Sequence, residues 1–150
     1  MPPETPAFKR PESVLVLVYT DTGKVLLLKR RDRADFWQSV TGSLEWHEAP
    51  LAAAVRELRE ETGLDGSGKL RDLNLQVRFP IFPEWRRRYA PGVEENLERA
   101  YAFRLPNECP IQLSEEHTDF GWFDRQEAAA KAASWSNRDV IERLASESNG

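Results

Sequence analysis

Three glutamates lie close together in the sequence, and their spacing suits the binding of a divalent cation. Glu60 and Glu61 follow Glu57 by three and four residues. At about 100° per residue in a helix, these positions share one sector of the helix surface. Grouped carboxylate oxygens are the ligands that Mg²⁺ and Mn²⁺ prefer. Acidic runs on helices are also common as solvated faces, so the glutamates alone leave both interpretations open.

The segment around these glutamates predicts a helix that would position them. Pro50 is typical of a first helical turn and Gly63 of a C-terminal stop, so the helix is expected to span Pro50–Thr62. One face of it is apolar, at the spacing of a stripe that packs on a sheet. This stripe consists of Leu51, Val55, Leu58 and Thr62. The three glutamates are expected to lie away from the stripe.

Strands are predicted on both sides of this helix, because apolar and β-branched residues are concentrated in short segments bounded by turn residues. A turn at residues 21–23 joins the first two strands as a hairpin. Asp124 and Glu127 resemble a capping box that opens a helix, and a last helix is expected over about residues 138–145. The predicted strands are residues 13–20, 24–29, 36–41, 70–79, 97–105 and 119–124. This order predicts a mixed α/β (α+β type) fold in which helices flank a sheet.

Length and composition narrow the class of protein. With 150 residues, the chain is expected to form one domain over residues 1–150, with a loose N-terminal arm at residues 1–8. Its longest apolar run, residues 14–19, is far too short to cross a membrane. The single cysteine, Cys109, excludes an intrachain disulfide and favours a reducing, cytoplasmic setting. A net charge of −4 argues against a nucleic-acid partner but allows a small phosphorylated ligand. Composition gives no indication of the oligomeric state.

The glutamates belong to a longer register, GSLEWHEAPLAAAVRELREETGL, over residues 42–64. Its defining positions are Gly42, Glu48, Arg56, Glu57, Leu58, Glu60, Glu61, Gly63 and Leu64. This register resembles the Nudix box at every defining position. The resemblance implies the Nudix fold, a mixed sheet sandwiched between helices. It also implies Mg²⁺-dependent hydrolysis of a diphosphate that is linked to another group.

The resemblance assigns expected roles within the box. Hydrolysis of a phosphoanhydride needs cations that neutralise two adjacent phosphates and a carboxylate that accepts a proton from water. Glu57 and Glu61 are the first expected metal ligands, with Glu60 beside them, and Glu57 is a candidate catalytic base. Arg56 is expected to hold a glutamate in place, whereas Gly42 and Gly63 serve the backbone at the two ends of the motif.

One position departs from the usual box. Many Nudix boxes carry a second glycine immediately before the residue that is Glu48 here, and this chain has His47 instead. Histidine tolerates a positive φ better than branched residues do, so the loop can keep its conformation if that position requires one. A role for His47 as a metal ligand is the alternative, although hard cations prefer oxygen.

Segments outside the box indicate a branch of the family. These are KRP (residues 9–11), FWQSVTG (36–42), RYAPGV (88–93), EEHTDFGWF (115–123) and SWSNR (134–138). Together they are similar to the Nudix hydrolases that remove pyrophosphate from dihydroneopterin triphosphate in folate biosynthesis. Hydrolysis of nucleoside triphosphates or dinucleoside polyphosphates is the alternative reaction. A Nudix-fold binding module without activity is a third hypothesis, which the presence of all three glutamates disfavours.

This branch resemblance implies a substrate site. Glu116 is expected to act as a metal ligand or general base, Lys9 and Arg30 to bind the triphosphate, and Thr41 to donate a hydroxyl. A flat pterin ring needs apolar walls with polar groups at the rim. The expected walls are Phe79, Pro80, Ile81 and Phe82 on one side and Ser134 on the other. Pro80 is expected to interrupt strand pairing and leave nearby backbone groups free for the ligand.

Overall fold

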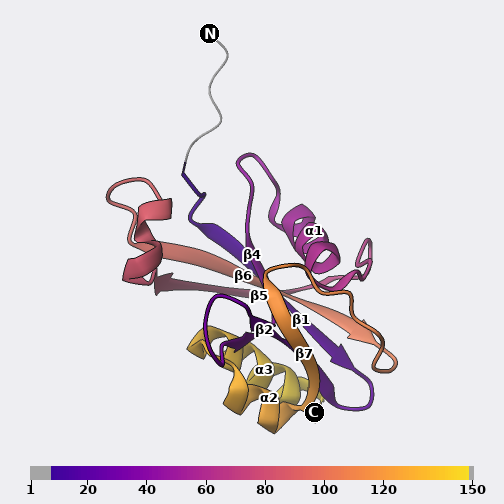
Figure 1. The fold of residues 1–150 in the computed structure, drawn as a ribbon. Coiled ribbons are helices and arrows are strands. Elements are labelled where there is room, and N and C mark those ends of the chain that lie inside the picture. Colours follow the sequence, from indigo (N-terminus) through magenta and orange to yellow (C-terminus); the bar gives the residue numbers. More distant parts are fainter. Residues whose placement is uncertain (1–7, 149–150) are drawn as a thin grey trace.

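A mixed sheet of seven strands organises the protein (Figure 1), which the computed structural model describes over residues 8–148. Of the predicted N-terminal arm, residues 1–7 lie outside the described residues. The strands are β1 (Glu12–Thr20), β2 (Lys24–Arg30), β3 (Trp37–Gln38), β4 (Val40–Ser43), β5 (Arg71–Pro80), β6 (Glu95–Leu105) and β7 (His117–Asp124). The main path of the sheet is β3-β2-β1-β6-β5, while β4 pairs with β1 and β7 with β2. The predicted mixed α/β class is confirmed.

The pairing of the first strands follows from the apolar, β-branched sequence at the N-terminus. β1 and β2 form the predicted antiparallel hairpin, with Tyr19 opposite Val25. β1 also pairs in parallel with β6 over its whole length, so both of its edges are occupied. This position explains why β1 is almost completely buried.

The single strand predicted over residues 36–41 is wrong, because the structure has two short strands there. β3 pairs with β2, whereas β4 pairs with β1. Ser39 lies between them and is bound to a helix instead of to a strand. Its backbone N–H donates to Asn137 Oδ1 at 2.8 Å, and Asn137 Nδ2 donates to its Oγ at 2.9 Å. A side chain from the far end of the chain therefore interrupts the strand.

Helices cover both faces of the sheet. α1 (Pro50–Thr62) lies on one face, and α2 (Arg125–Lys131) and α3 (Trp135–Ser148) lie on the other (Figure 1). A 3₁₀ helix, η1 (Pro83–Arg88), connects β5 to β6. The α1 face buries Leu58 against the even-numbered residues of β1, such as Val16. The α3 face buries Ile141 against odd-numbered residues such as Leu15. No helix within residues 8–148 has the length and apolar character needed to cross a membrane.

The bounds of α1 agree with the sequence, but its buried face differs from the predicted stripe. Gly63 ends the helix with φ 79°, and its N–H donates to Arg59 O. Leu51 is 52% exposed, so its place in the stripe is wrong. The buried face of α1 is rotated toward Ala54 and consists of Ala53, Ala54, Leu58, Glu61 and Thr62. Glu61, predicted to lie away from that stripe, is buried beside Leu58 with 2% exposure.

The C-terminal helices also begin differently from the prediction. Asp124 does not cap α2, because its carboxylate pairs instead with Lys24 Nζ at 2.7 Å. α3 begins at Trp135 and reaches Ser148, beyond both predicted ends. Ser134 provides the N-terminal cap, since its Oγ accepts a hydrogen bond from the Asn137 N–H at 3.1 Å.

Candidate active site

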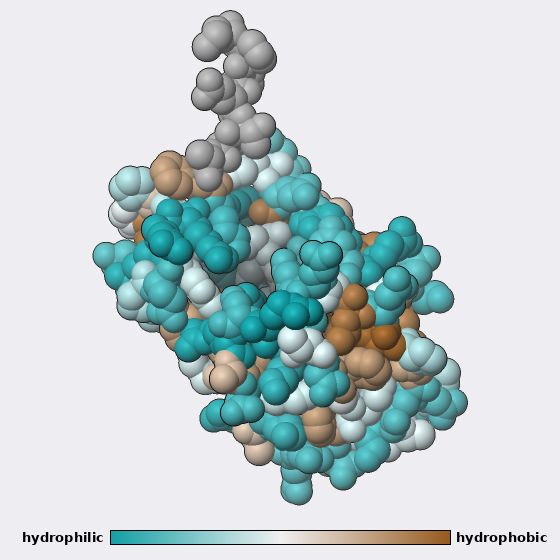
Figure 2. All heavy atoms as spheres, in the orientation of Figure 1, coloured by the Kyte–Doolittle hydropathy of each residue, from teal (hydrophilic) through white to brown (hydrophobic). Residues whose placement is uncertain are grey.

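A cavity of about 380 Å³ lies where α1, η1 and the start of α3 approach the same part of the sheet. Figure 2 shows a hollow near the middle of the face of the molecule that is turned to the viewer, rimmed mainly by hydrophilic residues. Most of the predicted site residues line the cavity, although they come from segments far apart in the sequence. They are Lys9, Arg30, Thr41, Gly42, Glu57, Glu60, Phe79, Ile81, Phe82, Glu116 and Ser134. The fold therefore brings the box and the branch-specific segments to one place.

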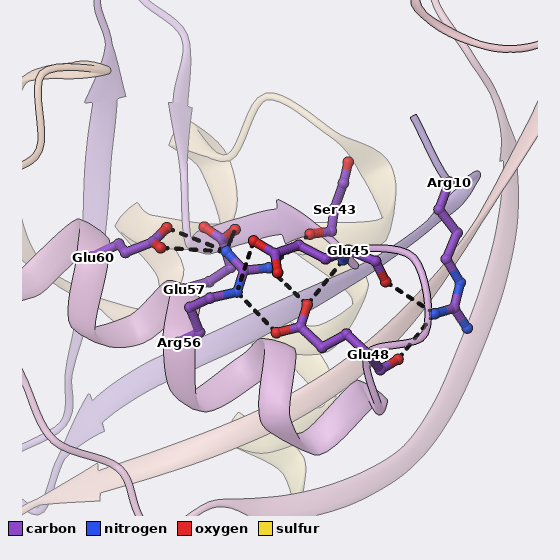
Figure 3. Close-up of polar contacts among 7 residues, drawn as sticks. All are labelled: Arg10, Ser43, Glu45, Glu48, Arg56, Glu57 and Glu60. Atoms are coloured by element: carbon purple, nitrogen blue, oxygen red, sulfur yellow. Dashed lines mark hydrogen bonds and ion pairs between the residues drawn. The ribbon is translucent and has the colours of Figure 1, made fainter. Parts of the chain in front are cut away.

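Arg56 holds the acidic part of the box together (Figure 3). Its Nε and Nη2 donate to the two carboxylate oxygens of Glu48 at 2.9 and 2.8 Å. Its Nη1 donates to Glu57 Oε1 at 2.8 Å and lies 3.3 Å from Glu60 Oε2. Nη2 also donates to the Ser43 carbonyl at 3.1 Å, which ties β4 to α1. One guanidinium thus fixes the orientation of three carboxylates and lies outside the cavity lining.

The loop before α1 has the backbone that the sequence anticipated. His47 has φ 70°, so the position does require a positive φ, and histidine occupies it. The neighbouring Glu48 is held through both its side chain and its backbone. Its Oε1 accepts a hydrogen bond from the Glu45 N–H at 2.9 Å, and its carbonyl accepts one from Arg10 Nη1 at 2.9 Å. The hydrogen bond from Arg56 lowers the pKa of Glu48. Glu48 therefore serves as a fixed anion of the loop.

Glycine at position 42 allows the carboxylate of Glu57 to approach β4. A Cβ atom at Gly42 would lie far inside the van der Waals distance of the Glu57 carboxyl carbon. We expect Gly42→Ala to displace Glu57 and to lower kcat by roughly 100-fold, since small misplacements of reacting groups have effects of that size. Steady-state kinetics provides the measurement. Gly92→Ala, at an open turn with φ 90° and nothing within 4 Å, controls for the effect of backbone strain alone. Wild-type turnover by Gly42→Ala would contradict this role.

Glu61 carries a carboxylate that the protein leaves unsatisfied. Its side chain is 2% exposed, and neither of its carboxylate oxygens has a hydrogen-bond partner among the described residues. His117 Nε2 lies 3.4 Å from Oε1. Burial lowers the pKa of His117 to about 4, so this imidazole is neutral at pH 7. Burial, followed by the charge of Glu57, raises the pKa of Glu61 well above its usual value. This carboxylate therefore lacks a positive partner.

The acidic residues fit a divalent cation in their donor chemistry. Within residues 8–148, no group of three or more acidic, histidine or cysteine side chains is arranged to hold a metal ion as it stands. Glu57 and Glu60 turn toward Arg56 instead. Even so, the buried and unpaired oxygens of Glu61 beside Glu57 are the arrangement that a bound cation would stabilise. Oxygen donors of this kind match Mg²⁺ or Mn²⁺.

Glu116 reaches the cavity from the loop before β7. Two bonds hold this loop against the end of β2: Arg31 N–H donates to Glu116 O at 2.9 Å, and Arg31 Nε donates to Glu115 O at 2.7 Å. Ser114 Oγ also accepts the Glu116 N–H at 3.4 Å. The carboxylate thereby lines the cavity together with Glu57 and Glu60.

Three cations line the same cavity as these carboxylates. Arg30 forms a forked pair with Asp32, both contacts at 2.7 Å, and lies over the Trp85 ring at 5.4 Å. The other two cations are Lys9 and Arg88. The backbone N–H of Lys9 donates to Arg88 O at 2.8 Å, which brings these two residues together beside Arg30. Partial burial, and then the charges of Arg88 and Arg30, lower the pKa of Lys9. Such mutual repulsion among cations favours a polyanionic ligand.

The aromatic part of the cavity lies at the end of β5. Phe79, Ile81 and Phe82 line it, and Phe82 meets Trp85 edge to face with ring centroids 5.0 Å apart. Pro80 is exposed and is not a lining residue, because side chains alternate along a strand. The expectation that Pro80 interrupts the pairing is wrong, since it pairs with Glu95 as the last residue of β5.

Sequence reasoning missed a polar group at the base of the cavity. Its members are Ser13, Gln38, Asn96, Glu98 and Asn137. Each is buried, although β6 was interpreted simply as a strand with partial alternation. The signal that could have found them is the inward register of β6. Asn96 and Glu98 have the same parity as the buried Ala100, so they were bound to face the core side of the sheet.

Comparisons with known proteins identify the family of the chain. Residues 9–144 match the family described as NUDIX domain. The chain is 47% identical to a dihydroneopterin triphosphate diphosphatase of Escherichia coli K12, over 91% of this chain and 93% of the relative. It is 41% identical to the Haemophilus influenzae protein of the same name, over 91% and 88%. A solved E. coli dihydroneopterin triphosphate pyrophosphohydrolase superposes with a TM-score of 0.85 at 46% identity, covering 92% of this chain and 97% of that one. The chain belongs to the Nudix family.

Proposed function

We propose that this protein hydrolyses dihydroneopterin triphosphate to dihydroneopterin monophosphate and pyrophosphate, with Mg²⁺ as cofactor. The names of the E. coli and H. influenzae relatives support this substrate, and the similarity extends along nearly the whole chain. The reaction consumes one water and breaks the bond between the first and second phosphates. The substrate is a small molecule, and the single cysteine agrees with a cytoplasmic setting.

The acidic residues carry the proposed chemistry. Glu57, Glu60, Glu61 and Glu116 would hold the cation, with Glu61 as the buried ligand and Glu116 approaching from the opposite loop. When bound, the ion neutralises charge on adjacent phosphates and makes water more acidic. Glu57 or Glu116 accepts the proton from the attacking water. Arg56 acts through Glu57 and Glu48, because its donors are directed at these carboxylates.

The remaining cavity residues would bind the substrate at its two ends. Lys9, Arg30 and Arg88 would neutralise the triphosphate, and the Thr41 hydroxyl would contact a phosphate beside Gly42, since all of them line the cavity. Phe79, Ile81 and Phe82 would enclose the ring, with Ser134 on the opposite wall. One observation carries the proposal: a single cavity of about 380 Å³ joins cations and carboxylates to aromatic walls.

The test is a substrate panel with the purified protein and Mg²⁺. We expect dihydroneopterin triphosphate to have a higher kcat/KM than dATP, GTP and diadenosine tetraphosphate, and to release pyrophosphate instead of orthophosphate. Chelation by EDTA should abolish turnover and added Mg²⁺ should restore it, since the carboxylates need a cation. Faster turnover of a nucleotide or dinucleotide would contradict the pterin substrate and support the alternative Nudix reaction. Turnover unaffected by EDTA would contradict the metal requirement.

A further inference from the structure

Glu98 is a buried acid that none of the proposed chemical steps uses. It lies on β6 with 6% exposure and lines the cavity. Its parity matches Ala100, which packs on the α3 face of the sheet. The glutamates of α1 approach from the opposite face, where Leu58 and Val16 pack. Glu98 therefore lies at the ring end of the cavity and not among the candidate metal ligands.

The carboxyl group of Glu98 is held in place but not neutralised. The hydroxyl of Ser136, near the start of α3, is its hydrogen-bond partner. Burial raises the pKa of Glu98 to about 7, and the Ser136 hydrogen bond opposes that shift. No cation in the described part of the chain contributes to the pKa shift of Glu98. A carboxyl group in this condition gains from a ligand that supplies N–H donors.

Asn96 adds an unsatisfied acceptor two residues before Glu98 on the same face of β6. Its side chain is buried with 4% exposure and lines the cavity. Nδ2 donates to Ser13 Oγ at 2.7 Å, which fixes the orientation of the amide. Within residues 8–148, its Oδ1 has no hydrogen-bond partner. The base of the cavity thus presents two buried acceptors from neighbouring inward positions of one strand.

We propose that Glu98, with Asn96 beside it, determines ring specificity by accepting hydrogen bonds from the adjacent N–H and NH₂ groups of a 2-amino-4-oxopyrimidine edge. A carboxylate accepts two such parallel bonds, whereas adenine presents an amino group next to a ring acceptor that the carboxylate would repel. This inference deepens the proposed function and rests on it for the pterin. Guanine shares the same edge, so both pterin and guanine triphosphates are candidate sources of this chemistry.

The isosteric variant Glu98→Gln tests the proposal directly. It replaces one acceptor oxygen with a donor and should lower kcat/KM for dihydroneopterin triphosphate by about 10- to 100-fold, mainly through KM. Activity on dATP should stay within about threefold of wild type, because its edge does not use the carboxylate pair. Glu95→Gln is the matched control: it makes the same chemical change at an exposed position of the same strand. An equal loss on dATP, or no loss on the pterin, would overturn the proposal.

Two further measurements distinguish a failure of this proposal from a failure of the proposed function. If wild type prefers GTP to the pterin and Glu98→Gln selectively loses GTP turnover, the pterin substrate fails while the edge recognition stands. Fluorescence titration with neopterin, a pterin without phosphates, measures ring binding without turnover or metal. Wild type and Glu95→Gln should bind neopterin at least tenfold more tightly than Glu98→Gln. Equal binding, or no binding by wild type, would overturn the proposal even if the pterin triphosphate is hydrolysed.

Discussion

Glu57→Gln is expected to lower kcat by about 10³-fold while the protein stays folded, since removing one preorganised electrostatic group from an active site has an effect of that size. The amide keeps the shape of the side chain and its contact with Arg56 through the remaining oxygen, but it loses the charge that would bind a cation. Glu61→Gln should have a similar effect on turnover. Steady-state kinetics over a range of Mg²⁺ concentrations would measure both variants and show whether added metal restores activity.

Glu61→Gln allows a second readout that separates catalysis from folding. The Glu61 carboxylate is buried without a hydrogen-bond partner among residues 8–148, so its replacement by a neutral amide should raise the Tm of the metal-free protein. Glu142→Gln, the same change at an exposed position of α3, should alter neither Tm nor turnover. Activity that is unchanged in both Glu57→Gln and Glu61→Gln would contradict the metal assignment.

The second large effect is expected at Arg56, where even a conservative change removes a planar set of donors. Arg56→Lys keeps the charge but cannot bond both Glu48 oxygens, Glu57 and the Ser43 carbonyl together. We expect the free energy of unfolding to fall by roughly 2 kcal/mol, the scale of lost charge-assisted hydrogen bonds. Turnover should fall by about 100-fold, because Glu57 is no longer held in position. Urea denaturation and steady-state kinetics would measure the two effects.

Arg59 provides the matched control on the same helix. Its side chain is 62% exposed and pairs with the equally exposed Asp65 at 3.2 Å. Arg59→Lys should therefore change the free energy of unfolding by less than about 0.5 kcal/mol and leave turnover intact. If Arg56→Lys behaved like Arg59→Lys, the network drawn in Figure 3 would not be what orients Glu57.

The box could be predicted from the sequence because its residues are close together and each depends on local geometry. Glu57 and Gly42 are separated by a fixed number of residues in the motif, and they make one contact between α1 and β4. Gly63 ends α1 through its own positive φ, and His47 adopts a positive φ within a short loop. Such features depend on a few neighbouring residues, so they can be predicted from the sequence motif of residues 42–64.

Other features depended on partners far away in the chain. Ser39 interrupts the third predicted strand because Asn137 binds it across 98 positions. Leu51 follows the helical period of the apolar stripe, yet it is exposed because the buried face of α1 is rotated toward Ala54. Glu98 resembles any polar residue of a half-exposed strand until α3 is placed over it. The local sequence does not distinguish Ser39 or Leu51, and for Glu98 it offers only the parity of the residue along β6. The surroundings of all three residues are set by tertiary packing.

The arrangement of α1 and α3 on opposite faces of one sheet has an evolutionary consequence. Each helix belongs to its own buried cluster, and the strands separate the two clusters. Changes at positions without shared partners tend to be additive in their effects. Mutations that repack the α3 cluster can therefore accumulate without disturbing the carboxylates around Arg56. In such a protein, substrate preference can diverge between descendants by drift and selection on one face, while an inherited reaction is preserved on the other.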